Sequence, residues 1–222
     1  MPDLRPAVLL DVDGTLLDTN YLHVLAWWQA FEDTGRGPIA MSAIHRAIGI
    51  PSDGLVRQLI GEADEKTVDA HSTRYEPLRE NVRPFPKTAE LLRACAERGL
   101  AVVLATSGQK SDLEWMLPAI GAEDAVTGAT TSADVDEGKP APDLLTAAMD
   151  EHGLDPRRTV VVGDTVWDVE AANRAGLPCI ALACGGIGAQ ELRDAGAASV
   201  YDDPADLLEH LDDSPVGRVA AR

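Results

Sequence analysis

The chain has 222 residues, of which 45% are hydrophobic and 4% aromatic, so it can bury a core built mostly from Val, Leu, Ile and Ala. Its 37 acidic residues against 19 Lys and Arg give a formal net charge of −18, which repels phosphate backbones and anionic lipids and argues against nucleic-acid or membrane binding. Three scattered cysteines (Cys95, Cys179, Cys184), no membrane-length apolar run and no signal-peptide core lead us to expect a cytoplasmic protein.

Short, unbroken apolar runs alternate with helical patterns over most of the chain. Such runs are typical of strands that are buried on both faces, as in a parallel sheet. The clear runs are residues 7–10, 101–105, 159–162 and 179–183, and the weaker ones are 125–127 and 199–201. Helical patterns that each close at a glycine cover 88–98, 111–120, 142–152 and 166–175. The alternation predicts an α/β fold with a doubly wound parallel sheet.

Residues 19–83 break this alternation, because they hold helical patterns and no convincing strand. Two stripes follow the first of these helices at helical spacing: Tyr21, Val24, Leu25, Trp28 and Phe31, and opposite them His23, Trp27 and Ala30. We expect the first to be the apolar stripe and the second to face the sheet. We therefore predict an all-helical insert at 19–83, a sheet domain formed by 1–18 and 84–222, and a mobile tail at 212–222.

The first strand runs directly into the sequence DVDGT, residues 11–15. Ligands of open α/β sheets bind beyond the carboxyl ends of the strands, and side chains two positions apart in extended chain point the same way. Asp11 and Asp13 can therefore address one ligand, as nucleophile, metal ligand or acid/base. An EF-hand is excluded because Gly14 falls at loop position 4 and Leu22 at position 12, where glycine at 6 and Glu at 12 are needed. An acidic loop that merely caps a helix stays an alternative.

Two further segments carry polar groups next to predicted elements. Thr106, Ser107 and Gly108 follow the strand 101–105 and offer hydroxyl and amide groups for phosphoryl oxygens, although Ser and Thr also commonly cap helices. Lys139 directly precedes a proline-started helix. Taken alone, it is most simply interpreted as a solvated surface charge.

A fourth segment, GDTVWD at residues 163–168, follows the strand 159–162. Its Asp164 and Asp168 lie four residues apart on one face of an opening helical turn, an arrangement that suits magnesium. In this order, the four segments resemble the motifs of the haloacid dehalogenase-like hydrolase superfamily: DVDGT is the first, Thr106 the second, Lys139 the third and GDTVWD the fourth. The helical insert after the first motif resembles that superfamily's C1 cap, so the resemblance covers nearly the whole chain.

The resemblance implies a Rossmann-like core and a Mg²⁺-dependent phosphatase of a small phosphorylated metabolite. By analogy Asp11 is the nucleophile that forms an aspartyl-phosphate, and Asp13 is the general acid and base. Thr106, with Ser107 and Gly108 beside it, binds phosphoryl oxygens, and Lys139 neutralises charge. Mg²⁺ is held by Asp11, the main-chain carbonyl of Asp13 and Asp164. Asp168 either orients waters or Lys139, or ligates the metal directly.

The acid at position 13 favours phosphoryl transfer, because the dehalogenase and phosphonate-cleaving branches lack it. His23 resembles a histidine of the β-phosphoglucomutase branch that contributes to the substrate site on the cap side; a structural histidine at the seam is the alternative. That branch also has a cap arginine after a G-V-S run, which GIPSD at 49–53 lacks here, although Arg46 and Arg57 flank the region. A sugar phosphomutase is therefore the alternative function. A non-catalytic phosphate-binding module is a third, which the retained catalytic side chains disfavour; substrate identity and oligomeric state stay open.

Overall fold

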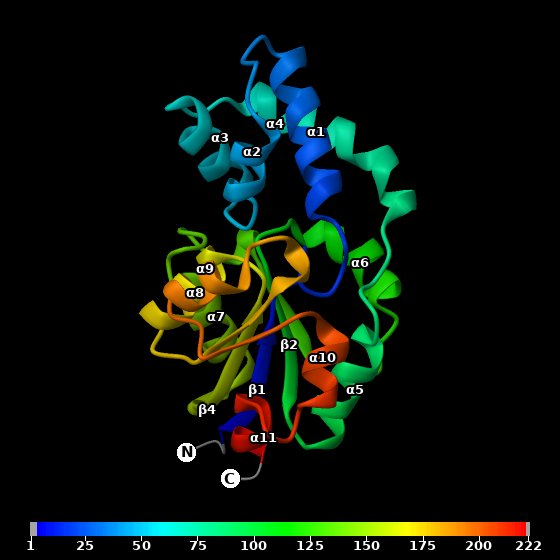
Figure 1. Ribbon diagram of the computed structural model, residues 1–222, viewed down its shortest axis with the longest axis vertical. Coiled ribbons are helices and arrows are strands. Elements are labelled where there is room, and N and C mark those ends of the chain that lie inside the picture. Colours follow the sequence, from blue (N-terminus) through cyan, green and yellow to red (C-terminus); the bar gives the residue numbers. More distant parts are fainter. Residues whose placement is uncertain (1–3, 221–222) are drawn as a thin grey trace.

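Six parallel strands form the central sheet, in the order β3-β2-β1-β4-β5-β6 (Figure 1). The computed structural model describes residues 4–220. Its strands are β1 Arg5–Leu10, β2 Ala101–Thr106, β3 Gly128–Thr131, β4 Leu154–Gly163, β5 Cys179–Leu182 and β6 Ser199–Tyr201. The chain builds the sheet outward from β1 through β2 to β3, and then returns to the other side of β1 to build β4 to β6. The expected doubly wound fold is confirmed.

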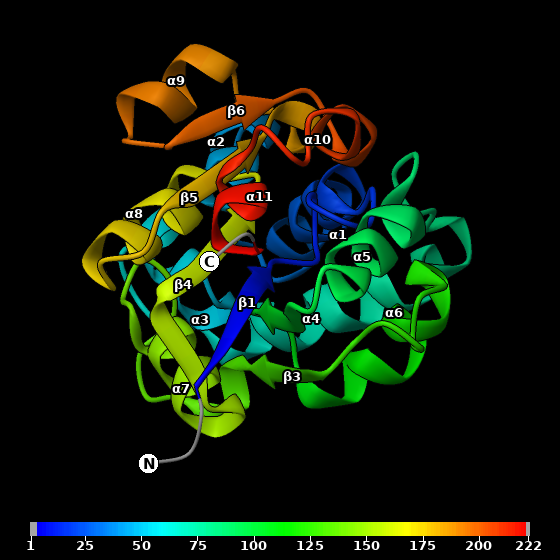
Figure 2. The same cartoon turned by 90° about the horizontal axis from the view of Figure 1, so that it is seen from below.

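Helices cover both faces of the sheet, as the view from below shows (Figure 2). One face is covered by α5 Thr88–Glu97, α6 Leu113–Ile120, α10 Pro204–Glu209 and α11 Pro215–Ala220, and the other by α7 Asp143–His152, α8 Val166–Arg174 and α9 Ala189–Asp194. Because strand side chains alternate, Val8 and Leu10 pack into the first layer, whereas Ala7 and Leu9 pack into the second. Burial on both faces explains why the strands read as unbroken apolar runs.

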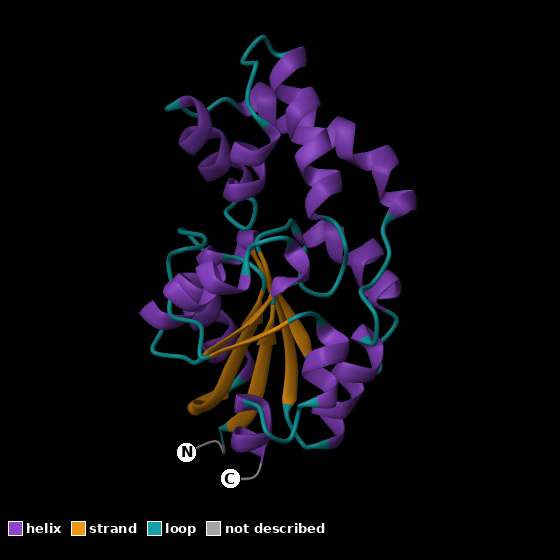
Figure 3. Cartoon of the chain, in the orientation of Figure 1, coloured by secondary structure: helices purple, strands orange, loops and turns teal. Residues whose placement is uncertain are grey.

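The chain between β1 and α5 forms a separate group of helices. They are α1 Asn20–Asp33, α2 Met41–Ala47, α3 Ser52–Ile60, α4 Glu65–Tyr75 and a 3₁₀ turn, Glu76–Asn81. Figures 1 and 3 show α1 to α4 together beyond the carboxyl ends of the strands, away from both termini. Trp27, Phe31, Ile44 and Leu55 belong to a buried cluster of this helical unit. A domain division at 19–83 stays a prediction.

The buried side of α1 differs from the expected stripe. Val24 and Phe31 are buried, but Tyr21 is 59% and Trp28 37% exposed. Trp27 is buried in their place, with its ring stacked 3.9 Å from that of His71 in α4. Because Trp27 and Trp28 are adjacent, the sequence allows either of them to lie on the buried side of α1. The packing of α4 against α1 determines that Trp27 is the buried one.

The tail was also predicted wrongly. Residues 215–220 form α11, which packs against β1 and β4 and buries Val216 and Val219 in the core. The hydrophobic gain from burying these valines outweighs the entropy that favours a mobile end. Residues 221–222 of the predicted tail lie outside the described residues.

The weak strand predicted at 125–127 lies three to four residues further along, at β3. Ala125 and Val126 pack beside the core as a loop, and pairing with β2 begins at Gly128, opposite Val103. The strand is at the sheet edge and consists of small and polar residues, so apolar content points to the wrong segment. No helix within residues 4–220 is both long and apolar enough to cross a membrane.

Candidate active site

Asp11 directly follows β1, at the point where the strand order turns from β1 to β4. Such a switch point is where ligands of open α/β sheets bind. The chain turns sharply at Gly14, whose φ of 78° lies in the left-handed region. A Cβ there would also collide with the Asn20 amide and lie 2.5 Å from an Asp164 oxygen. Only glycine allows the DVDGT turn to sit this close to Asp164.

Lys139 is buried rather than on the surface, so its interpretation as a solvated charge is wrong. Its Nζ lies 2.5 Å from Oδ1 of Asp11 and 2.7 Å from Oδ1 of Asp168. Burial acts to lower the pKa of Lys139, but the two carboxylates outweigh it and raise the pKa above its ordinary value. The lysine is therefore a fixed positive charge beside Asp11 at neutral pH.

The acidic groups at this point outnumber the one buried lysine. Carboxylate oxygens of Asp11, Asp164 and Asp168 all lie within 4.8 Å of one another. Burial, together with the charges of Asp168 and Asp13, raises the pKa of Asp11 to about 7 despite Lys139. Burial and the neighbouring Asp168 and Asp11 likewise raise the pKa of Asp164 well above its usual range. A buried cluster of oxygen donors with excess negative charge fits a divalent cation such as Mg²⁺.

The two acids of the fourth motif have different surroundings. Asp164 accepts hydrogen bonds from Oγ1 of Thr15 and Nδ2 of Asn20, each at 2.8 Å. Asp168 accepts from the Thr165 N–H at 3.0 Å and pairs with Lys139. Asp168 thus holds the lysine and the start of α8, whereas Asp164 is held by Thr15 and Asn20 beside the other two carboxylates. Sequence reasoning gave no role to Thr15, although it belongs to DVDGT, and did not assign Asn20, which lies outside the four motifs.

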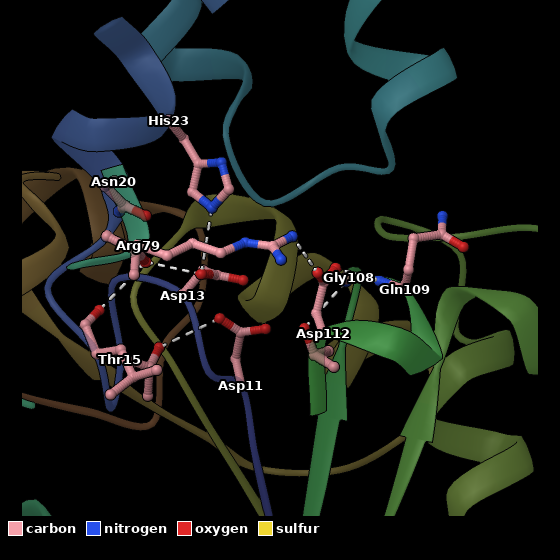
Figure 4. A network of polar contacts seen from close by, with 12 residues as sticks. Asp11, Asp13, Thr15, Asn20, His23, Arg79, Gly108, Gln109 and Asp112 are labelled. Carbon is pink, nitrogen blue, oxygen red and sulfur yellow. Dashed lines mark hydrogen bonds and ion pairs between the residues drawn. The ribbon is translucent and has the colours of Figure 1, made fainter. Parts of the chain in front are cut away.

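Asp13 faces the helical unit (Figure 4). Its Oδ1 accepts from Oγ1 of Thr19 at 2.7 Å and lies 3.3 Å from Nε2 of His23, which comes down from α1. Burial pushes the pKa of Asp13 upward, but the bonds from His23 and Thr19 outweigh it, so the net pKa is lowered. The structure thus brings His23 to Asp13, at the boundary between the sheet and the helical unit.

A cavity of about 270 Å³ lies between the carboxyl ends of the strands and the helical unit. Asp11, Asp13 and His23 line it, as do Ser107 and Gly108. Lys139, Asp164 and Asp168 lie outside its lining, where they surround the Asp11 carboxylate. Thr106 is fully buried; its Oγ1 accepts from the Gly108 N–H at 3.0 Å. The predicted phosphate-binding segment therefore presents Ser107 and Gly108 to the cavity and keeps the Thr106 hydroxyl beneath them.

The far wall of the cavity contains residues that sequence reasoning missed. It is lined by His71 and Tyr75 of α4, Arg79 of the 3₁₀ turn, and Asp112 and Trp115 next to and within α6. No motif or spacing in the sequence marks Arg79. The two arginines that were considered lie elsewhere.

Arg46 and Arg57 are those two arginines. Arg46 pairs with Glu191 at 2.5 Å and is exposed, and Arg57 lines a surface groove that adjoins the cavity and shares Ile50, Ser52 and Ser107 with it. Neither lines the cavity.

Comparison with known proteins agrees with this geometry. The family model described as haloacid dehalogenase-like hydrolase matches residues 8–182. A crystal structure of a hydrolase from Pseudomonas syringae superposes with a TM-score of 0.88 at 35% identity, covering 94% of this chain and 99% of that one. The chain is 30% identical to "Probable phosphatase IndB" of Dickeya dadantii, over 96% of this chain and 99% of that protein. It is 26% identical to a phosphoglycolate phosphatase of Rhodospirillum rubrum, over 92% and 90%.

A doubly wound sheet with an acidic switch point and a lysine beside it defines a class of α/β hydrolytic enzymes. The chain belongs to the haloacid dehalogenase-like hydrolase family, and the resemblance inferred from its four motifs is confirmed.

Proposed function

We propose that the protein is a Mg²⁺-dependent phosphatase that hydrolyses a small phosphorylated metabolite through an aspartyl-phosphate on Asp11. The observation that carries this proposal is the pairing of two aspartates at one cavity, Asp11 against a buried lysine and Asp13 beneath a histidine. Relatives named as phosphatases support it.

Each aspartate has a distinct task in the proposed reaction. A carboxylate oxygen of Asp11 attacks phosphorus, and the ester oxygen leaves with a proton from Asp13. Asp13 is ionised in the resting protein, and the approach of the phosphate's negative charge favours its protonated form. Asp13 then takes a proton from water, which attacks phosphorus, releases phosphate and restores Asp11. Lys139 reduces the repulsion between the Asp11 carboxylate and the phosphoryl group.

The proposed Mg²⁺ ligands are Asp11, the main-chain carbonyl of Asp13 and Asp164. Bound Mg²⁺ would neutralise charge on the transferring phosphoryl group. The excess of buried carboxylates over lysine supports this assignment. Asp168, already bonded to Lys139 and Thr165, is proposed to orient the lysine.

A phosphatase fits the cavity better than a phosphomutase, which must hold a second phosphate. Neither Arg46, which pairs with Glu191, nor Arg57, which lines the adjoining groove, is part of the cavity wall, and this argues against a clamp from either. The three cysteines are unpaired, which supports a reducing compartment such as the cytoplasm.

The test is phosphate release from a panel of small phosphate esters, with Mg²⁺ and with EDTA. We expect release that requires Mg²⁺ and is abolished in Asp11→Asn. Asp150→Asn, the same change at an exposed position of α7, serves as the matched control and should keep full activity. Near-normal turnover by a folded Asp11→Asn protein would contradict the proposal.

A further inference from the structure

The carboxyl and guanidinium groups of the cavity wall lie in two places. Among the described residues that line the cavity, Asp11 and Asp13 lie at the reaction centre, and Arg79 and Asp112 lie on the far wall. The other titratable lining groups are Tyr75 and two histidines, of which His71 has its pKa held well below the usual range by burial. The interaction between Arg79 and Asp112 therefore decides the charge that surrounds the leaving group of a bound substrate.

Arg79 and Asp112 form an ion pair inside the cavity wall. Nη2 of Arg79 lies 2.7 Å from Oδ1 of Asp112, and Figure 4 shows the guanidinium extended toward that carboxylate. The guanidinium carbon lies 5.8 Å from the ring centre of Tyr75 and 5.2 Å from that of Trp115. Cation–π contacts with these two rings hold the Arg79 guanidinium in place.

Asp112 is fixed by more than the arginine. Its Oδ2 accepts from the Gln109 N–H at 3.0 Å, and its Oδ1 accepts from Nε1 of Trp115 at 3.2 Å. A second anion that approached Arg79 would not displace a carboxylate held in this way. It would share one cation with Asp112 and lie beside a like charge, which disfavours binding.

An uncharged hydroxyl group of a ligand, in contrast to a second anion, is favoured beside Arg79 and Asp112. Arg79 donates to Asp112 through Nη2, and its side chain is 35% exposed, so the guanidinium N–H groups that Asp112 does not engage can donate to a ligand oxygen. The neighbouring Asp112 accepts hydrogen bonds only, so it suits a hydroxyl proton. A hydroxyl group can serve both partners at once, as acceptor for one and donor for the other.

The rest of the wall combines flat aromatic rings with uncharged polar side chains such as Ser72, Gln109 and Ser111. His23 stacks on Tyr75 with ring centres 3.8 Å apart, and Trp27 stacks on His71 beside them. Pockets of this kind combine apolar area with a few polar groups that orient the ligand. The volume of about 270 Å³ limits that ligand to a small molecule.

We propose that the substrate is a phosphate monoester of a small, uncharged polyhydroxy compound, and that the Arg79–Asp112 pair selects it over esters with a second anionic group. This inference rests on the proposed phosphatase function. It assigns specificity to two residues outside the reaction centre, and neither is among the residues that carry the phosphoryl chemistry.

The first test compares esters that differ only in the second group: 2-hydroxyethyl phosphate with 2-phosphoglycolate, and glycerol 3-phosphate with 3-phosphoglycerate. We expect the uncharged member of each pair to have a kcat/KM at least about tenfold higher. Equal values, or preference for the carboxylates, would overturn the inference while leaving a phosphatase in place. No phosphate release from any ester or from p-nitrophenyl phosphate would instead remove the proposed function, and this inference with it.

The second test removes the negative charge from the wall. In Asp112→Asn, Arg79 has no anionic partner, so the ratio of kcat/KM values should shift toward the carboxylate esters by about tenfold. Asp33→Asn, which removes the carboxylate of the Arg74 pair on the outer side of α1, is the matched control and should leave the ratio unchanged. An unchanged ratio in a folded Asp112→Asn protein would also overturn the inference.

Arg79→Gln tests the same wall if Asp112→Asn fails to fold. It removes the guanidinium donor, so kcat/KM for the uncharged esters should fall, mainly through KM, while turnover of p-nitrophenyl phosphate falls much less. Equal losses for all esters would show that Arg79 does not select the substrate.

Discussion

The two walls of the cavity are built on different principles. On the sheet side, Asp11 and Asp13 line the cavity and Lys139 lies behind Asp11; all three come from segments beyond the carboxyl ends of parallel strands, so the topology itself brings them together. On the helical side, His23 and Arg79 are brought together only by the rotation and packing of α1 and α4. The groups proposed for the phosphoryl chemistry are therefore anchored to the sheet, whereas the helical side can vary without moving them.

The largest expected effect is on the sheet side, at Lys139. Lys139→Met leaves Asp11 and Asp168 as buried carboxylates without their cation, so activity should fall by about 10²–10³-fold. The metal-free protein should lose about 3 kcal/mol of stability. Phosphate release and urea unfolding measure the two effects. Lys110→Met, at an exposed position, is the control; activity within tenfold of wild type in Lys139→Met would contradict the account.

A smaller effect is expected for a substitution of Asp164, which should weaken Mg²⁺ binding but raise the stability of the metal-free protein. Asp164→Asn should weaken Mg²⁺ binding at least about tenfold, measured as the Mg²⁺ concentration for half-maximal activity. Because burial and nearby acids raise the pKa of Asp164, its charge destabilises the metal-free fold at neutral pH. The variant without Mg²⁺ should therefore melt higher, by roughly 2–4 °C for each kcal/mol gained. A lower melting temperature would show that the carboxylate is not under electrostatic strain.

The smallest effect is expected on the helical side, at His71. Burial keeps the pKa of His71 well below its usual value of 6.5. Below that pH the unfolded chain binds a proton that the native protein does not, so this residue lowers stability as the pH falls from about 6.5 toward the native pKa.

His71→Phe keeps a ring against Trp27 and removes this titration. The difference in unfolding free energy between wild type and variant should change by at most about 1.4 kcal/mol per pH unit below pH 6.5, and stay constant above it. Urea unfolding at several pH values measures it. A difference that is flat across the whole range would mean that His71 has the same pKa in the native and the unfolded protein, which would contradict the account.

The sheet was predictable because burial on both faces leaves an unbroken apolar run, as at residues 7–10. DVDGT and Lys139, which are far apart in sequence, were expected at one site only through the resemblance to the haloacid dehalogenase-like superfamily, and the structure brings them together. The edge strand β3 was predicted three to four residues too early because Gly128 and its neighbours are not apolar. The helix α11 escaped prediction because only two valines anchor a short terminal segment.

The helical wall was less predictable for a different reason. Trp27 and Trp28 are equally apolar, and only packing against α4 determines which one is buried. Arg79 stands in a 3₁₀ turn with no periodicity, and its partner Asp112 is 33 residues away. Such cross-element contacts leave no local pattern. His23 could be located at the seam, but its 3.3 Å approach to Asp13 could not.

The central claim is that Asp11 accepts the phosphoryl group. The most direct measurement is intact-mass and peptide analysis of Asp13→Asn that has reacted with p-nitrophenyl phosphate and has then been quenched. The leaving group of this ester needs no proton from Asp13. We expect a phosphoryl group to accumulate on the peptide that contains Asp11, because the second step lacks its base, and to be absent from an Asp11→Asn protein treated alike. Phosphorylation of another residue, or turnover in Asp13→Asn with no covalent adduct under any quench, would contradict the account.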